Sequence, residues 1–383
     1  MTGVVAGDPD RAARAALSRL AEPGDPWIGT AVTEVGAVEV LRRVRATGER
    51  DGARWAQYRV RLPGLEADLG QAQRVGARLV VPDDEEWPAG LDDLAERAPW
   101  ALWLTGEGHL RDLTRRAVAV VGARACSTYG EHVAAELAAG LGDRGWTVVS
   151  GGAYGIDAAA HRGALAVDVP TVAVLACGVD VPYPAAHAGL FSRIQEGGVV
   201  VSELAPGSRP TRRRFLERNR VIAALTRGTV VVEAAVRSGA LSTAGHAASL
   251  GRTVMAVPGP VTSAMSAGSH ELLRTRDGSL VTDASDVLDL VGELGLDASD
   301  PRRGETRAHD ALGPAAMRVL DALPVVRRAG PDSVGRVAGL DAPTVLRALG
   351  ELAGAGLAEC AGGRWRRRRA PGAGAGPAGS PTS

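Results

Sequence analysis

Two segments in the middle of the chain combine glycine, hydroxyl and arginine residues in a way that suits phosphate chemistry. The first runs from Gly122 to Arg124, and the second is the sequence Ser-Gly-Gly-Ala-Tyr-Gly at positions 150–155. Glycine at the turn between a strand and a helix lets a phosphate approach the backbone, and the start of the helix supplies free amide donors. A guanidinium group adds a forked partner for phosphate oxygens. The two segments therefore predict an anion-binding site.

A third segment is rich in arginine and carries a lone aromatic ring. Between residues 206 and 228 there are seven arginines and one acidic residue, and Phe215 in this run is one of two phenylalanines in the chain. Guanidinium groups pair with phosphate oxygens, and an isolated ring offers a surface on which an unpaired base can stack. A duplex reader lays a helix in the groove, whereas a loop of this composition favours a flexible single strand.

A fourth segment brings Arg237, Ser238 and Gly239 to the start of another predicted helix. Small and hydroxyl residues at a helix N-terminus can complete a phosphate pocket. They can equally serve close packing of the helix on a sheet, and the residues themselves leave both interpretations open.

The chain has 44 positive charges, all of them arginine, and the absence of lysine excludes several kinds of chemistry. A Walker-type phosphate loop requires its lysine, and a Schiff-base enzyme requires an amine nucleophile. The first glycine turn does not follow the Gly-x-Gly-x-x-Gly pattern, and the second predicted strand ends in Ser150-Gly151-Gly152 without the acidic residue that binds a ribose. No nucleophile–base pair appears among these loops, so we predict no catalytic residue and no cofactor.

Metal chemistry has no better support. Cys126, Cys177 and Cys360 are scattered, with neither metal-ligand spacing nor the pattern of a disulfide framework. Asp157 and His161 lie four residues apart on one helix face, but no third ligand accompanies them. We therefore predict no metal site and a reducing compartment.

Targeting and membrane-spanning patterns are absent from the sequence. Residues 1–10 lack the charged-then-apolar pattern of a signal peptide, and no uninterrupted apolar run approaches the roughly 20 residues that a spanning helix needs. Acidic and basic residues balance at 44 each, so any basic surface must be local. We expect a soluble, cytoplasmic protein without a membrane partner.

The central region must position the phosphate-binding segments, and its pattern is that of a doubly wound α/β domain. Apolar runs predict strands at 117–121, 147–150, 171–176, 199–202, 229–233, 253–257 and, weakly, 279–282. Helical patterns lie between them at 131–144, 156–166, 220–226 and 241–250. Continuous apolar strands alternating with helices imply a mostly parallel sheet covered on both faces, which binds ligands at the carboxyl ends of its strands.

The flanking regions predict smaller units. Residues 1–75 show helical stretches at 11–20 and 31–47 and form a small helical domain, whereas 79–110 is expected to be an irregular segment with Trp87, Trp100 and Trp103 in the core. The α/β domain spans 76–295, and a polar linker follows at 296–311. Three helical patterns and a two-strand wing at 312–368 have the order of a winged helix. The tail, 369–383, is expected to be disordered.

The central motifs resemble those of the DNA-processing protein A family, DprA, also called Smf. The matching pieces are VGARACSTYG at 121–130, SGGAYGIDAAAHRGAL at 150–165, FLERNRVIAAL at 215–225, VVVEAAVRSGALSTA at 230–244 and AVPGP at 256–260. They stand in the family's order and spacing. Two departures are visible: Gly152-Ala153-Tyr154 stands where many members have Leu, Ala and Arg, and arginine replaces lysine.

The resemblance implies an extended Rossmann-like fold, with a small N-terminal helical domain (of the SAM or helix-hairpin-helix type) and a winged helix that occurs in many members. It implies a non-enzymatic protein that binds and protects single-stranded DNA, loads the recombinase RecA onto it in natural transformation or recombination, and forms a homodimer. The resemblance and the residue patterns together predict these DNA-binding residues: Gly122, Arg124, Ser150, Gly151, Gly152, Gly155, Arg212, Phe215, Arg218, Asn219, Arg220, Ser238 and Gly239.

Two other functions share parts of this pattern. Nucleotide phosphoribohydrolases of the lysine-decarboxylase-like group have the same α/β architecture, but their PGGxGTxxE signature is met here only by Pro258-Gly259. A duplex-binding regulator would depend on the third helix of the C-terminal region, which holds one basic residue, Arg347. Arg364 and the arginines at 366–369 could still contact phosphate, and a protein-interaction role for this region is at least as well supported.

Overall fold

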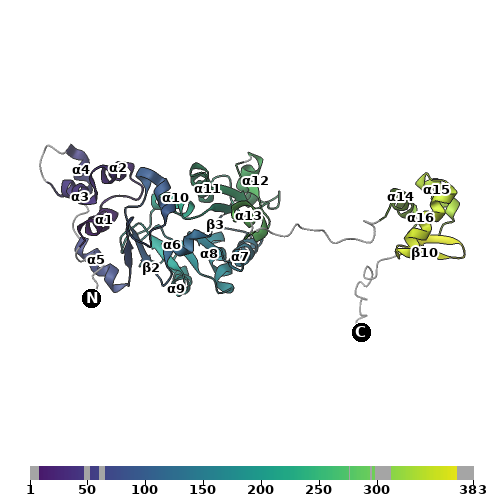
Figure 1. Cartoon of the computed structure of the whole chain (residues 1–383), viewed down its shortest axis with the longest axis horizontal. Helices are drawn as coiled ribbons and strands as arrows, with labels where there is room; N and C mark the ends of the chain where they lie inside the picture. Colours follow the sequence, from purple (N-terminus) through teal and green to yellow (C-terminus); the bar gives the residue numbers. More distant parts are fainter. Residues whose placement is uncertain are drawn as a thin grey trace, which may run out of the picture. The chain divides into compact units, whose positions relative to one another are not determined.

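A computed structural model of the chain describes residues 8–46, 52–59, 65–275, 277–293, 296–297 and 312–368. The chain forms two compact units, residues 1–299 and 300–383, and each is described here by itself. In the first unit, helices surround a large sheet, and α1 to α4 gather at one end of it (Figure 1).

The described part of the first unit is built on a nine-stranded sheet in the order β1-β2-β6-β5-β4-β3-β7-β8-β9. The strands from β6 to β9 are parallel, whereas β2 pairs antiparallel with both β1 and β6. Their bounds are β1 Arg78–Val80, β2 Leu102–Thr105, β3 Ala117–Val121, β4 Thr147–Ser150, β5 Thr171–Val174, β6 Val199–Ser202, β7 Gly228–Val231, β8 Thr253–Ala256 and β9 Ser279–Leu280. The mostly parallel α/β sheet predicted from the sequence is confirmed.

The segment at 79–110 is not irregular as expected, because β1 and β2 extend the sheet by two antiparallel strands. Both strands are short, so their apolar runs are weak signals, and β2 forms only by pairing with the distant strand β6. Trp87, Trp100 and Trp103 are buried, as predicted.

Helices cover both faces of the sheet, which explains why the strands are apolar along their whole length. Val118 and Val120 of β3 face the core shared with α7, α8 and α13, whereas Ala117 and Ala119 face the core shared with α10 and α11. The helices of this region are η2 Ala89–Arg97, α6 Leu110–Arg115, α7 Thr128–Gly142, α8 Ile156–Ala166, η3 Ala185–His187, α9 Ala188–Gln195, α10 Arg212–Ala224, α11 Gly239–Ser249, η4 Ala264–Ser266, α12 Ala267–Arg274 and α13 Ala284–Val291. The sequence patterns did not predict α9, α12 and α13.

The strand order reverses between β3 and β7. From β3 the chain builds outward through β4, β5 and β6 on one side, and it then returns to build β7, β8 and β9 on the other. Adjacent connections leave the sheet in opposite directions at such a point, so a crevice opens at the carboxyl ends of β3 and β7.

The N-terminal helices are α1 Pro9–Leu20, α2 Pro26–Val35, α3 Ala37–Arg45, α4 Gly52–Arg59 and α5 Leu65–Arg74. The helix expected at 31–47 is interrupted at Gly36, whose φ of 81° ends α2. Trp103 of β2 donates a hydrogen bond of 3.0 Å to Ser18 of α1.

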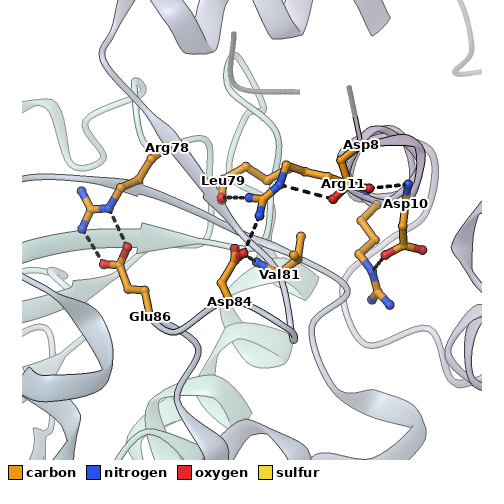
Figure 2. Close-up of polar contacts among 9 residues, drawn as sticks. Asp8, Asp10, Arg11, Arg78, Leu79, Val81, Asp84 and Glu86 are labelled. Atoms are coloured by element: carbon orange, nitrogen blue, oxygen red, sulfur yellow. Dashed lines mark hydrogen bonds and ion pairs between the residues drawn. The ribbon is translucent and has the colours of Figure 1, made fainter. Parts of the chain in front are cut away.

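Figure 2 shows how α1 is tied to the sheet: Arg11 donates to the Leu79 carbonyl at 2.7 Å and pairs with Asp84. Asp84 also accepts from the amide of Val81 at 2.8 Å, so one carboxylate joins α1 to the end of β1. Helix α1 therefore packs directly on the sheet.

The second unit has three helices followed by a hairpin, the order of elements predicted from the sequence. These elements are α14 Pro314–Ala322, α15 Pro331–Ala338, α16 Ala342–Gly354, β10 Ala358–Ala361 and β11 Arg364–Arg367. Val319, Leu349 and Leu352 lie in its separate core. The predicted tail at 369–383 and the predicted linker, apart from 296–297, lie outside the described residues.

Within the part of the chain that the structure describes, no helix has both the length and the apolar character needed to cross a membrane. Cys126, Cys177 and Cys360 are free thiols.

Candidate nucleic-acid interface

A pocket of about 530 Å³ lies where the strand order reverses, and we call it the arginine pocket. The turn after β3, the loop before α8, helix α10 and the start of α11 all contribute to it. Its lining includes eight of the predicted DNA-binding residues: Gly122, Arg124, Arg212, Phe215, Arg218, Asn219, Ser238 and Gly239. Segments that are more than 100 residues apart in the sequence therefore meet at one site.

Helix α10 begins at Arg212, so the arginine-rich run is a helix and not the loop predicted from the sequence. The hydroxyl of Thr211 caps the helix by accepting from the amide of Arg214 at 3.3 Å. Phe215, Arg218 and Ile222 then recur at spacings of three and four residues and line the pocket. The pocket is thus lined by one face of a rigid element.

The half-buried ring of Phe215 is the centre of a cluster of cations and aromatic rings. The guanidinium of Arg124 lies 4.4 Å from the ring centroid, and that of Arg218 lies 5.8 Å from it. The ring of Tyr183 lies 5.6 Å away. Because Arg124 already contacts the Phe215 ring, a stacking base would compete with that guanidinium for the ring.

Arg218 is a buried cation in the wall of the pocket, with only 6% of its surface exposed. It donates to the Gly151 carbonyl at 2.8 Å, to the Val174 carbonyl and to the side-chain oxygen of Asn219 at 3.2 Å. Burial lowers the pKa of Arg218 to about 10. The group stays charged at neutral pH and is held in one orientation by these carbonyls.

Asp157 is the one acidic residue among the described residues of the pocket lining. Burial raises the pKa of its carboxyl above the ordinary value, although the charge of Arg218 and a hydrogen bond from the Ala153 amide act in the opposite direction. Against this single carboxyl stand Arg124, Arg212, Arg218 and Arg237, so the pocket attracts anions.

The predicted residues Ser150, Gly151, Gly152 and Gly155 do not line the pocket, although they lie behind it. The Ser150 hydroxyl donates to the Val120 carbonyl at 2.7 Å inside the sheet. A side chain at Gly151 would collide with Arg218, and Gly155 has a φ of 76° and packs against the backbone of Ala123. Gly151 leaves room for the Arg218 side chain, and Gly155 leaves room for the turn that carries Arg124.

Arg220, predicted as a DNA contact, does not line the pocket. Its side chain is 1% exposed and forms a forked ion pair with Glu203, at 2.8 and 2.6 Å. It points to the other side of α10, where Gly24 of the N-terminal region covers it. Residues two positions apart on a helix face different directions, so Arg218 and Arg220 have different surroundings.

Several lining residues were not among those predicted: Asp157, Tyr183, Thr211, Arg237 and Thr243. Arg237 precedes Ser238 in the fourth segment, and its side chain lines the pocket together with Ser238 and Gly239. Tyr183 comes from the loop after β5, and its sequence neighbourhood contains no phosphate-binding pattern. Only the folded chain brings its ring to Phe215.

His161 is a core residue. Its Nδ1 lies 2.9 Å from the hydroxyl of Thr171, which itself donates to the Val148 carbonyl at 2.6 Å, so the imidazole is the donor in the first contact. Burial lowers the pKa of His161 to about 3. No three His, Cys, Asp or Glu side chains among the described residues are grouped so that they could hold a metal ion.

Comparison with known proteins identifies the family. The model of the family described as DNA recombination-mediator protein A matches residues 78–292. The chain belongs to this family. It is 48% identical to the putative DNA processing protein DprA of Mycobacterium tuberculosis H37Rv over 95% of this chain and 96% of that protein. It is 36% identical to protein Smf of Escherichia coli K12, over 80% of this chain and 82% of that one.

The fold is also that of a solved family member. The X-ray structure of DNA processing protein A from Streptococcus pneumoniae matches with a TM-score of 0.61 and 32% sequence identity. The match covers 73% of this chain and 97% of that structure. The resemblance to the DprA/Smf family seen in the central motifs is confirmed.

In this DprA family member, the outer face of α10 is attached to the loop after α1 and to η2. Arg214 makes a forked ion pair with Glu22 at 2.9 Å for both contacts, and Glu217 pairs with Arg97 at 2.5 Å. Residues that line the pocket therefore alternate along one helix with residues that pair with Glu22 and Arg97.

We expect a Glu22→Gln variant to loosen the first turn of α10 without unfolding the protein. A partly exposed ion pair contributes about 0.2–1 kcal/mol. Affinity for an anion in the arginine pocket should fall by roughly two- to fivefold, and amide exchange should accelerate at residues 212–215. Glu39→Gln is the matched control, because Glu39 pairs with Arg42 and Arg43 within α3. Equal exchange rates at 212–215 in the wild-type and Glu22→Gln proteins would contradict this role.

Proposed function

We propose that this chain binds single-stranded DNA in the arginine pocket, protects the strand and loads RecA onto it during natural transformation or DNA recombination. The observation that carries the proposal is that four arginines line the same pocket as the half-buried ring of Phe215, with two of them close to the ring. Guanidinium groups suit the phosphates and an aromatic ring suits an unpaired base, which is the combination that single-strand binders use. Membership of the recombination-mediator family supports the same ligand.

The pocket also argues for binding without catalysis. Among its described lining residues, the only carboxyl belongs to Asp157, which is buried beside Arg218 and exposed by only 6%. A hydrolase of the phosphoribohydrolase kind would need an accessible acid or base near its substrate. We accordingly propose that the protein is not an enzyme. From the family resemblance we also propose that it is a cytoplasmic homodimer and that its second unit is a winged helix.

Replacing Arg124 with Ala tests the proposal directly. Arg124 is exposed at the mouth of the pocket, so its loss should weaken oligo-dT binding with little effect on folding. If Arg124 neutralises one phosphate, the slope of log K against log salt should become shallower by about 0.7. The measurement is fluorescence anisotropy of a labelled oligo-dT at several salt concentrations.

Arg144→Ala serves as the control, because Arg144 is exposed on the first unit and does not line the pocket. Unchanged affinity and unchanged salt slope in the Arg124→Ala protein would overturn the proposed site. The proposed ligand would be overturned if a protein that lacks residues 312–383, with no other change, bound duplex DNA more tightly than oligo-dT.

A further inference from the structure

The hairpin of the second unit concentrates that unit's positive charge. Residues 312–368 contain nine arginines and five acidic residues. Six of the nine arginines, but only one acid, Glu359, lie on the hairpin or on the segment before α15. We call these six residues the hairpin arginines: Arg327, Arg328, Arg364, Arg366, Arg367 and Arg368. The three helices of the unit carry the remaining arginines and acids in near balance.

Strand pairing brings the two groups of hairpin arginines together. β10 and β11 pair antiparallel, with Glu359 opposite Arg366, and Ala329 forms an antiparallel bridge with Trp365. β11 therefore lies between β10 and the segment that carries Arg327 and Arg328. Arginines that are about 40 residues apart in the sequence therefore lie on neighbouring strands of one small sheet.

Glu359 is the single carboxylate among the hairpin arginines, and it cannot neutralise all six of them. Glu359 pairs with Arg328 at 3.2 Å and with Arg366. The other four hairpin arginines are exposed: Arg327, Arg364, Arg367 and Arg368. Beside them, Val325, Val326, Glu359 and residues 366–368 line a groove of about 450 Å³. The chain as a whole has no net charge, and this local excess of positive charge suits a partner with closely spaced negative charges.

The chemistry of the unit favours a duplex backbone over a single strand. The one aromatic residue of the hairpin, Trp365, packs against the core of the unit, so no free ring is presented for an unpaired base. Among the exposed positions of α16, Pro343, Leu346 and Gly350 have no side-chain donors for base edges, and Arg347 is the one basic residue of this helix. Two glycines, Gly362 and Gly363, make a narrow tip with φ of 59° and 71°. Arginines beside a narrow tip suit a phosphate backbone or a minor groove, without sequence readout.

We propose that the hairpin arginines form a second DNA site, which binds the backbone of duplex DNA independently of its sequence. This site is separate from the arginine pocket and does not depend on the function proposed for that pocket. A chain with both sites would hold a duplex and a single strand at the same time.

The test compares the full-length protein with a variant that carries Arg327→Gln, Arg364→Gln, Arg367→Gln and Arg368→Gln. Anisotropy is measured with a short mixed-sequence duplex between about 50 and 200 mM salt. Removing four phosphate contacts should make the salt slope shallower by about 3 to 4 and weaken duplex binding by tenfold or more. The same four positions changed to Lys keep the charge and should restore duplex binding, which separates loss of contact from misfolding.

A matched control removes the same charge elsewhere: Arg144, Arg162, Arg193 and Arg274 are exposed on the first unit, and all four are changed to Gln. This control protein should retain duplex affinity. Equal losses in the two proteins, or no loss in either, would overturn the hairpin site. If the hairpin Gln variant bound duplex DNA as well as wild type but lost binding to vesicles of anionic phospholipid, the hairpin would be assigned to a membrane instead.

A bridging assay distinguishes the two proposed sites. Oligo-dT fixed to beads should capture a labelled duplex only in the presence of the wild-type protein. The Arg124→Ala protein should lose capture but keep its duplex affinity, whereas the hairpin Gln variant should keep its oligo-dT affinity but lose capture. Duplex affinity that falls in the Arg124→Ala protein as much as in the hairpin variant would show that there is only one site.

Discussion

Replacing Arg218 with Met is expected to destabilise the first unit by about 3–5 kcal/mol and to abolish DNA binding in the arginine pocket. The guanidinium of Arg218 is buried and donates to the carbonyls of Gly151 and Val174. Met keeps an unbranched apolar stem but has no donor, so both carbonyls lose this partner and Asp157 loses the nearest positive charge. Urea denaturation and oligo-dT anisotropy measure the two effects.

The control for Arg218→Met lies on the same helix. Arg213 is exposed, so Arg213→Met should change the free energy of unfolding by less than about 0.5 kcal/mol. A similar small change in the Arg218→Met protein would contradict the buried role of that guanidinium.

The destabilisation by Arg218→Met should depend on pH. Burial already raises the pKa of Asp157, and loss of the Arg218 charge raises it further. A carboxyl whose folded-state pKa exceeds its unfolded value of about 3.9 stabilises the fold while protonated, and it loses this contribution as the pH rises through the folded-state pKa. The variant should therefore lose more stability, relative to wild type, at pH 8 than at pH 5. An equal loss at the two pH values would show that Asp157 is not coupled to Arg218.

Replacing Phe215 with Ala is expected to weaken oligo-dT binding by roughly 5- to 150-fold, the value of one stacked base at about 1–3 kcal/mol. The ring is half-buried at the centre of the pocket, in contact with Arg124 and Tyr183. A base that binds there exchanges places with the Arg124 guanidinium, which is then free to pair with a phosphate. Anisotropy with labelled oligo-dT gives the affinity, and thermal unfolding should show only a modest change.

An abasic oligonucleotide of the same length separates stacking from a structural effect. It has the phosphates but no base, so wild-type and Phe215→Ala proteins should bind it about equally. Phe215→Tyr keeps an aromatic ring and should bind oligo-dT much as wild type does. A loss on the abasic strand as large as on oligo-dT would mean that Phe215 acts only by holding Arg124.

Local sequence patterns were sufficient for much of the fold. The apolar runs at 117–121, 147–150 and 199–202 are strands with those same bounds. Such a run must be buried on both faces, and a parallel sheet between two layers of helices does this. The glycine turns and the arginines also indicated the anion site from local sequence, because their chemistry depends on residue type and on neighbours close in the chain.

The parts that the sequence did not predict depend on contacts between distant segments. β2 exists because it pairs with β6, almost 100 residues later. The start of α10 was missed because its first turn shows no apolar periodicity, and its cap and ion pairs come from Thr211 and from Glu22. No local pattern shows that Glu22 lies beside residue 214.

The amino-acid sequence by itself determined the class of fold, the family and the residue types of the anion-binding pocket. Tertiary structure alone decided which of these residues face the pocket. Arg218 and Arg220 are two positions apart and chemically identical, yet one lies in the wall of the pocket and the other pairs with Glu203 on the far side of α10. Burial and charge pairing are set by what the rest of the chain places around a residue, and the residue's own type does not encode that environment.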